Sequence, residues 1–149
     1  MDVVDLAAGR TARTVPDAHA RPPARVVLNE VSPFASHPAS AYNLFATTAP
    51  DGCAKLWDLR DTRCVRSLSA HANRQVSVGA AFSPCMRYLA VGSEDKTACV
   101  YDLRTGLVCD KLRGHGDAVV DVAYHPLHPQ LVTAGLDGHL RFFADTDGP

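Results

Sequence analysis

Alternating apolar and polar residues mark three short segments, each of which follows an acidic residue. The third and fifth residues after Asp51, Asp95 and Asp137 are apolar, and the residue between them is Lys, Cys or Arg. An alternation of period two is typical of a β-strand with one buried face. We therefore expect a half-buried strand after each of the three acids.

Further apolar runs precede each acid. One apolar run lies directly upstream of each acid. The turn between this run and the strand that follows the acid carries Asp-Gly, Asp-Lys or Asp-Gly, and such turns favour β-hairpins. A third run, still further upstream, ends at Pro84 in one copy and at Pro126 in another, 42 residues later. Each copy is thus expected to form a small antiparallel sheet. The runs next to the acids are residues 43–48, 88–92 and 131–135.

The spacing of the acids shows that one unit of structure is repeated. Asp51, Asp95 and Asp137 are separated by 44 and 42 residues, and an aromatic residue stands six positions after each acid. Self-similarity at this period is the signature of a repeat architecture. The aromatic residues are Trp57, Tyr101 and Phe143.

The repeated residues resemble a known family. The run from Gly114 to Asp137, with its Gly-His-Gly-Asp start, and the run LAVGSEDKTACVYD at 89–102 are similar to the WD-repeat motif of β-propellers. This resemblance implies an all-β fold, with about three four-stranded antiparallel blades. Since propellers have about four to eight blades, we expect an incomplete propeller that forms an open arc.

The repeat register divides the chain. Val4-Asp5-Leu6 aligns with Tyr101-Asp102-Leu103, so residues 1–25 are expected to be the end of a preceding blade plus a Pro-rich loop. Within residues 1–25, residues 10–16 would form an outer strand. This strand could complete the sheet of the last repeat. The alternative is that the N-terminal segment is a disordered tail. The expected repeats are 26–70, 71–114 and 115–149, the last lacking its own outer strand. We expect a fragment or short isoform of a larger propeller, whose uncovered flank could self-associate.

The resemblance also implies a hydrogen-bonded chain inside each blade. In the family a His before the first strand, a Ser or Thr on the second, the Asp of the turn and the Trp of the third strand bond to one another. Val91 stands at the hydroxyl position of the second repeat and Phe143 at the indole position of the third, so each of these chains should lack one link. The matching residues are His19, Thr47, Asp51, Trp57, His71, Asp95, Tyr101, His115, Thr133 and Asp137.

Composition and charge exclude several classes. The chain has 149 residues, of which 46% are hydrophobic and 21% charged, with a net charge of −1, so no electrostatic pattern indicates nucleic acid or a membrane surface. No apolar stretch approaches the roughly 18 residues of a membrane span. Five cysteines without CxxC spacing favour reduced thiols, and hence an intracellular protein, cytoplasmic or nuclear.

An enzyme is not indicated by the motifs. Ser93, His71 and Asp95 provide the residue types of a hydrolase triad, but His and Asp recur once per repeat, as scaffold residues do. The histidines at 115, 125, 128 and 139 lack HxxxH spacing and cysteine partners, so they do not predict a metal site. We expect neither catalysis nor a cofactor.

The preferred interpretation is a scaffold whose loops bind a protein or peptide. Loops between repeats, and turns between the second and third strands, should line one face of the blades. Arg74 is the strongest single candidate, because Arg is favoured at binding hot spots. The candidate loop residues are Pro50, Asn73, Arg74, Glu94 and Leu136.

Two other functions are consistent with smaller patterns. Arg60 and Arg104 each follow a Trp-Asp or Tyr-Asp pair by two residues, which resembles the box that docks propeller receptors onto cullin–RING ubiquitin ligases. Asp-x-Arg also recurs in WD repeats because the two charges pair on the surface. The basic residues at 10, 13, 21 and 25 would be needed for nucleic-acid binding, but Asp2, Asp5 and Asp17 dilute them.

Overall fold

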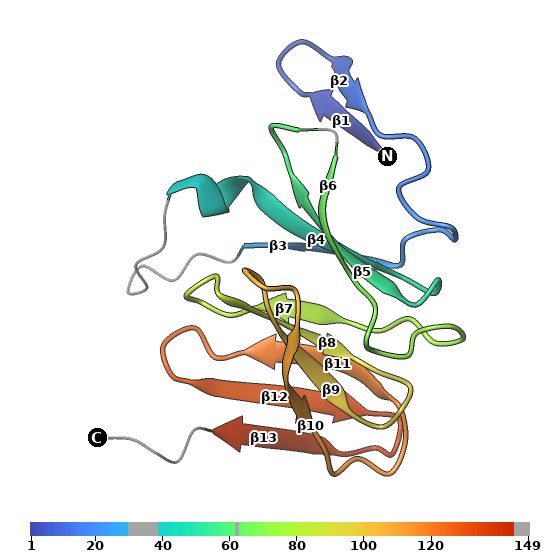
Figure 1. The fold of residues 1–149 in the computed structure, drawn as a ribbon, viewed down its shortest axis with the longest axis vertical. Helices are drawn as coiled ribbons and strands as arrows, with labels where there is room; N and C mark the ends of the chain where they lie inside the picture. Colours follow the sequence, from blue (N-terminus) through green and yellow to red (C-terminus); the bar gives the residue numbers. More distant parts are fainter. Residues whose placement is uncertain (30–38, 62, 145–149) are drawn as a thin grey trace.

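Three antiparallel sheets follow one another along the long axis of the molecule (Figure 1). The structure is a computed structural model, and it describes residues 1–29, 39–61 and 63–144. The first sheet has the strands β3 (Arg25–Leu28), β4 (Leu44–Ala49), β5 (Cys53–Asp58) and β6 (Cys64–Leu68) in that order. The second has β7 (Ala80–Phe82), β8 (Tyr88–Gly92), β9 (Ala98–Asp102) and β10 (Val108–Leu112). The third has β11 (Val119–Tyr124), β12 (Gln130–Gly135) and β13 (Leu140–Ala144).

The all-β class that the family resemblance implied is confirmed. Each sheet is a meander of neighbouring strands, and the register repeats from one sheet to the next. In all three sheets the aromatic residue lies opposite an apolar residue two positions before the place of Thr47. These Cα pairs are Phe45 with Trp57, Leu89 with Tyr101, and Leu131 with Phe143. The molecule is an incomplete propeller, with four strands in the first two blades and three described strands in the third.

Apolar side chains hold the blades face to face. The core between the first and second sheets includes Leu56, Leu68, Leu89 and Tyr101, all of them buried. A smaller core joins the second and third sheets through Ala90, Val119 and neighbours. Because both faces of the second sheet are covered, its strands β8 and β9 are almost wholly buried, which rigidly fixes the turns that they carry.

The N-terminal segment forms a separate hairpin next to the first sheet. Strand β1 (Asp2–Asp5) pairs with β2 (Arg10–Thr14), and the amino group of Met1 donates to the carbonyl of Val15 at 2.8 Å. Val15 is buried against Phe45 and Trp57. The alternative in which 10–16 complete the last repeat is therefore wrong for this structure: β2 lies at the opposite end of the molecule from β13 (Figure 1).

Two features depart from a plain series of strands. A 3₁₀ helix, η1 (Ala39–Asn43), leads into β4 and buries Ala41 against the first core. At the other end, β13 pairs with β12 and with no further strand among the described residues. Leu140 and Phe142 on β13 are 66% and 77% exposed, so the outer face of the third sheet is apolar. Within the described residues no helix is long and apolar enough to cross a membrane.

Candidate functional site

The first repeat contains a closed hydrogen-bonded chain behind its loop. His19 Nδ1 lies 2.9 Å from Asp51 Oδ2, and its Nε2 lies 2.7 Å from the Thr47 hydroxyl. The indole N–H of Trp57 donates to the same hydroxyl at 2.8 Å. One assignment of protons satisfies all four groups: Nδ1–H donates to Asp51, and Nε2 accepts from Thr47. The structure thus brings together the four residues that the family pattern names.

The third repeat builds the same chain without the indole. His115 Nδ1 lies 3.1 Å from both oxygens of Asp137, and Nε2 lies 2.8 Å from the Thr133 hydroxyl. The amides of Gly116 and His139 also donate to Asp137, and the Gly116 bond contributes most to lowering the pKa of that carboxyl. Phe143 offers no N–H to Thr133.

Gly135 makes room for this pair. A Cβ atom at Gly135 would collide with His115 Nδ1 and with the Asp137 carboxylate. The close approach of a backbone to two polar side chains is a setting in which only glycine fits.

The second repeat departs from the expected pattern. His71 Nδ1 bonds to the Tyr101 hydroxyl at 2.9 Å, and its Nε2 is buried without a partner among the described residues. Asp95 instead accepts from the Thr97 hydroxyl at 2.6 Å, and no hydrogen bond joins it to His71. The prediction that Asp95 holds His71 is wrong, because the phenol of Tyr101 already occupies Nδ1. Burial lowers the pKa of His71 to about 4.

These residues are internal supports. Thr47, Trp57, His71, Tyr101, His115 and Thr133 are buried, so none presents a reactive atom to a substrate. Within residues 1–29, 39–61 and 63–144, no three His, Cys, Asp or Glu side chains are grouped to hold a metal ion. The chains fix the loops that follow each His relative to the turns that carry each Asp.

In the loop between the first and second sheets, one carboxylate accepts from three consecutive amides. Oε1 of Glu94 accepts hydrogen bonds from the amides of Arg74, Gln75 and Val76 at 2.7, 2.6 and 2.8 Å. Burial alone would raise the pKa of Glu94, but these three amides lower it overall. We call residues 72–76 with Glu94 the clamped loop. Its geometry is set before any partner arrives.

Two of the five candidate loop residues have internal roles. Asn73 is fully buried and its amide donates to the carbonyl of Ala49 at 2.8 Å. The expectation that Asn73 faces a partner is therefore wrong, because its side chain joins the clamped loop to the preceding blade. Oε1 of Glu94 accepts hydrogen bonds from the backbone, so Glu94 would contribute to partner binding indirectly, by holding the clamped loop in place.

The other three candidates lie nearer the surface. Arg74 is exposed, Leu136 is 55% exposed and Pro50 is half-buried. Arg21 joins this group: its Nη1 donates to the carbonyl of Arg74 at 2.9 Å, although no sequence spacing links the two positions. The turn after β4, the loop after β6 and the turn after β12 lie on the same side of the stacked sheets (Figure 1). We call Arg21, Arg74, Gln75 and Leu136 the loop face.

The two Asp-x-Arg motifs are surface features. Arg60 makes a bidentate pair with Asp58, at 3.0 and 2.7 Å, and this bond lowers the pKa of Asp58 to about 2. Arg104 Nε lies 3.9 Å from Asp102, whose carboxylate accepts the Arg104 amide at 2.8 Å. Both guanidinium groups remain exposed.

Comparison with known proteins agrees with this geometry. The family model described as "WD domain, G-beta repeat" matches residues 62–102 and 106–143. The chain belongs to the WD-repeat family. The matched segments hold the second and third sheets almost completely, together with the end of the first.

Several curated WD-repeat relatives share part of the chain. GID complex subunit 7 of Schizosaccharomyces pombe is 32% identical over 96 residues, which is 63% of this chain and 19% of that protein. Polyadenylation factor subunit 2 of the same organism is 34% identical over 91 residues, 60% of this chain and 18% of that protein. The U5 small nuclear ribonucleoprotein 40 kDa protein of Pongo abelii is 31% identical over 80 residues, 52% of this chain and 22% of that protein. The matches thus span about a fifth of the length of these relatives.

Proposed function

We propose that the chain is a non-catalytic scaffold that binds a protein or peptide partner through the loop face. The observation that carries this proposal is the clamp of Glu94 on three consecutive amides, because a loop that is ordered in advance loses little conformational entropy on binding. Relatives whose names describe them as a complex subunit or a ribonucleoprotein component support a partner in general.

The chemistry of the loop face favours an acidic partner. Arg21 and Arg74 are both exposed, and the guanidinium of Arg21 donates to the backbone carbonyl of Arg74, so both cationic residues belong to the same loop surface. The carboxylate of Glu94 is turned toward the backbone, so it neutralises the pair only in part. Leu136 provides an exposed apolar contact on the same side. A peptide with carboxylates next to an aliphatic residue would complement this surface.

Selection from a displayed library of random peptides tests the proposal. We expect enrichment of acidic sequences, and Arg74→Ala should weaken their binding by about tenfold or more, equivalent to about 1.4 kcal/mol. Arg63→Ala is the matched control, since Arg63 is an exposed Arg paired with Asp61 at the turn after β5. If the selected peptides bind both variants as tightly as the parent chain, or if no peptide is selected at all, the loop face is not the binding surface.

A second candidate function is docking to a cullin–RING ligase adaptor through Arg60 and Arg104. The observation in its favour is that both guanidinium groups are exposed, although Arg60 is already engaged with Asp58. Adaptor pull-down with Arg60→Ala and Arg104→Ala distinguishes the two functions. Loss of adaptor binding in these variants would support a ligase receptor, whereas a parent chain that binds no adaptor would rule it out.

We also propose boundaries for the blades, a more specific relative and a cellular compartment. The blades correspond to residues 26–70, 71–114 and 115–149, with 1–25 as the end of a preceding blade, and their order and loops resemble the C-terminal blades of WD repeat-containing protein 27. The protein would act inside the cell, in the cytoplasm or nucleus, where its five cysteines stay reduced.

A further inference from the structure

Three arginine side chains meet at the turn between β9 and β10. Two of them share one carboxylate: Arg87 Nε lies 3.4 Å from Asp102 Oδ2, and Arg104 Nε lies 3.9 Å from Asp102 Oδ1. Arg66 reaches the same turn from β6 of the first sheet, where its two Nη atoms donate to turn carbonyls at 3.1 and 2.6 Å. We call Arg66, Arg87 and Arg104, together with Asp102, the arginine cluster.

The local structure holds these arginines in place. Gly106 has a φ of +76°, and a Cβ atom there would lie 2.9 Å from Arg66 Cδ, so glycine at this position leaves room for Arg66 to lie across the turn. The Arg87 guanidinium lies over the ring of Tyr88, 5.2 Å from the ring centroid. The cationic groups are therefore positioned before an anion binds.

A smaller cluster of the same kind lies on the first sheet. Arg13 takes the repeat position of Arg66, and its Nη1 donates to the carbonyl of Leu59, in the turn between β5 and β6, at 2.7 Å. Arg60 pairs with Asp58 at this turn, and Arg13 helps to lower the pKa of the same carboxyl. Two guanidinium groups thus meet one carboxylate, which leaves an excess of one positive charge.

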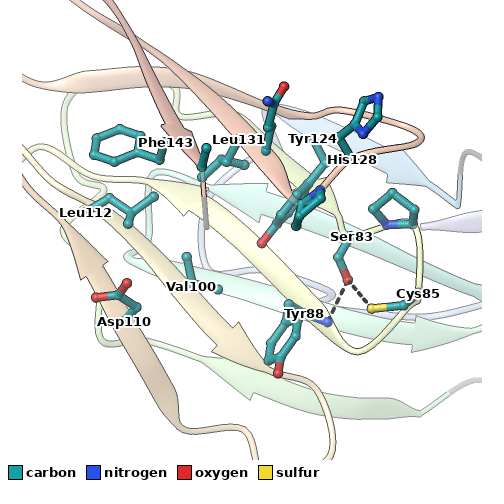
Figure 2. A pocket seen from close by; sticks show the side chains of 14 residues that line it. Ser83, Cys85, Tyr88, Val100, Asp110, Leu112, Tyr124, His128, Leu131 and Phe143 are labelled. Atoms are coloured by element: carbon teal, nitrogen blue, oxygen red, sulfur yellow. Dashed lines mark hydrogen bonds between the residues drawn. The ribbon is translucent and has the colours of Figure 1, made fainter. Parts of the chain in front are cut away.

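The arginine cluster has a larger excess, of two positive charges. The amide of Arg104, more than any other group, lowers the pKa of Asp102, so this carboxyl is ionised at neutral pH. The next acid along the chain, Asp110, lines a cavity of about 500 Å³ between the second and third sheets, beside Leu112 (Figure 2). It therefore lies on the face of the second sheet away from Arg66, and does not neutralise the cluster.

This excess charge fits a phosphate monoester. Such a group carries about −1.5 to −2 charges at pH 7 and three acceptor oxygens, whereas a carboxylate carries a single charge. Arg87 and Arg104 contact Asp102 through Nε, so their Nη groups can bind a ligand, and both side chains are exposed. Arg66 Nε is buried without a partner among the described residues, so this guanidinium also keeps an unused donor.

The arrangement of the charges favours a peptide over a polyanion. The two clusters are separate, and a carboxylate interrupts each of them, so they form no continuous basic stripe for a nucleic-acid backbone. A lipid-binding patch typically holds about four to eight basic residues without such acids. Leu107, beside the cluster, is 69% exposed and offers an aliphatic contact to a neighbouring residue of a peptide.

We propose that the arginine cluster binds a phosphoserine or phosphothreonine of a partner polypeptide, with an aliphatic residue of the same segment on Leu107. Hydrogen bonds between guanidinium and phosphate groups are charge-assisted and roughly twice as strong as neutral ones. The site is independent of the loop face, because β9 begins beyond Glu94 and ends at the opposite turn, which carries Arg104. It shares Arg104 with the adaptor motif, but Arg60 is not part of it.

Binding of labelled peptides with a central phosphoserine and random neighbours tests the site on the whole chain. We expect the peptides that bind to do so at least about tenfold more tightly than their unphosphorylated twins, and Arg104→Gln or Arg87→Gln to weaken them by about tenfold. Arg113→Gln, at an exposed position beyond the opposite end of β10, is the matched control and should change the affinity by less than about twofold. Equal binding of the twins, or no loss in either cluster variant, would overturn the proposal.

Nuclear magnetic resonance locates the phosphate directly. Phenyl phosphate titrated into the ¹⁵N-labelled chain should shift the amide signals of Thr105 and Gly106 in a saturable way, and leave those of residues 74–76 in place. Shifts confined to residues 74–76 would overturn this site without touching the proposed function of the loop face. So would Arg104-dependent binding of single-stranded RNA, or of phosphatidylcholine vesicles containing phosphoinositides, by a chain that binds no phosphopeptide.

Discussion

The indole N–H of Trp57 donates to the Thr47 hydroxyl at 2.8 Å, and both residues are buried. This bond completes the hydrogen-bonded chain that starts at His19 and Asp51. Among the described residues, the first repeat is the only one of the three in which every link of that hydrogen-bonded chain is formed. Because the chain joins the N-terminal segment to the first sheet, its removal should affect folding stability rather than a surface property.

Thr47→Val tests that link. The substitution keeps the shape of the side chain but leaves Trp57 Nε1 and His19 Nε2 without partners, and each buried unpaired group costs about 1–3 kcal/mol. We expect the free energy of unfolding to fall by roughly 2–4 kcal/mol in urea titrations. Thr11→Val, at an exposed position of β2, should cost less than about 0.5 kcal/mol. Equal losses in both variants would show that the chain contributes nothing specific.

Phe143→Trp should add the link that the third repeat lacks. Phe143 and Thr133 are spaced as Trp57 and Thr47 are, and the neighbouring cavity leaves room for the larger ring. A new indole bond to the Thr133 hydroxyl should stabilise the chain by about 0.5–1.5 kcal/mol. Phe142→Trp, on the opposite face of β13, is the matched control and should leave stability unchanged. If thermal melts show the same change in melting temperature for Phe143→Trp and Phe142→Trp, the new bond to Thr133 does not form.

His71 should make stability depend on pH. Burial lowers its pKa from 6.5 to about 4, although the carboxylates of Asp95 and Asp51 oppose the effect. The unfolded chain then binds a proton that the folded chain refuses, so the stabilisation is complete above pH 6.5 and is lost as the pH falls toward 4. The size of the loss is roughly 3 kcal/mol from this group.

Unfolding of His71→Gln at a series of pH values measures this contribution. Its stability should vary less between pH 6.5 and 4 than that of the parent chain, whereas His128→Gln, at an exposed position, should retain the parent's slope. A His71→Gln variant with the parent's pH dependence would mean that another group is responsible.

The repeat made much of the fold predictable. Period-two alternation around Asp51, Asp95 and Asp137 indicates strands because each blade buries one face against the next, and that constraint acts locally in the sequence. The hydrogen-bonded roles of Thr47, Trp57, His115 and Thr133 were expected from the resemblance to the WD-repeat family, and the structure forms these bonds.

What could not be predicted depends on contacts across the blades. His71 forms its hydrogen bond with the phenol of Tyr101 and not with Asp95. Which partner it finds depends on how far the Tyr101 ring reaches into the core. Asn73 is buried because the carbonyl of Ala49 in another blade accepts its amide.

The most direct test of the loop face is hydrogen exchange combined with peptide binding in Glu94→Ala. The amides of Arg74, Gln75 and Val76 should exchange slowly in the parent chain and at least about tenfold faster in the variant, because all three lose their acceptor. Asp117→Ala is the control: its Oδ1 accepts the single amide of Ala118 in the corresponding loop of the third repeat, so residues 74–76 should keep their protection. We expect peptides selected on the parent chain to bind Glu94→Ala about tenfold more weakly, although Arg74 is still present. Unchanged affinity in Glu94→Ala, with the three amides released, would contradict the proposal that a loop held in place beforehand is what binds the partner.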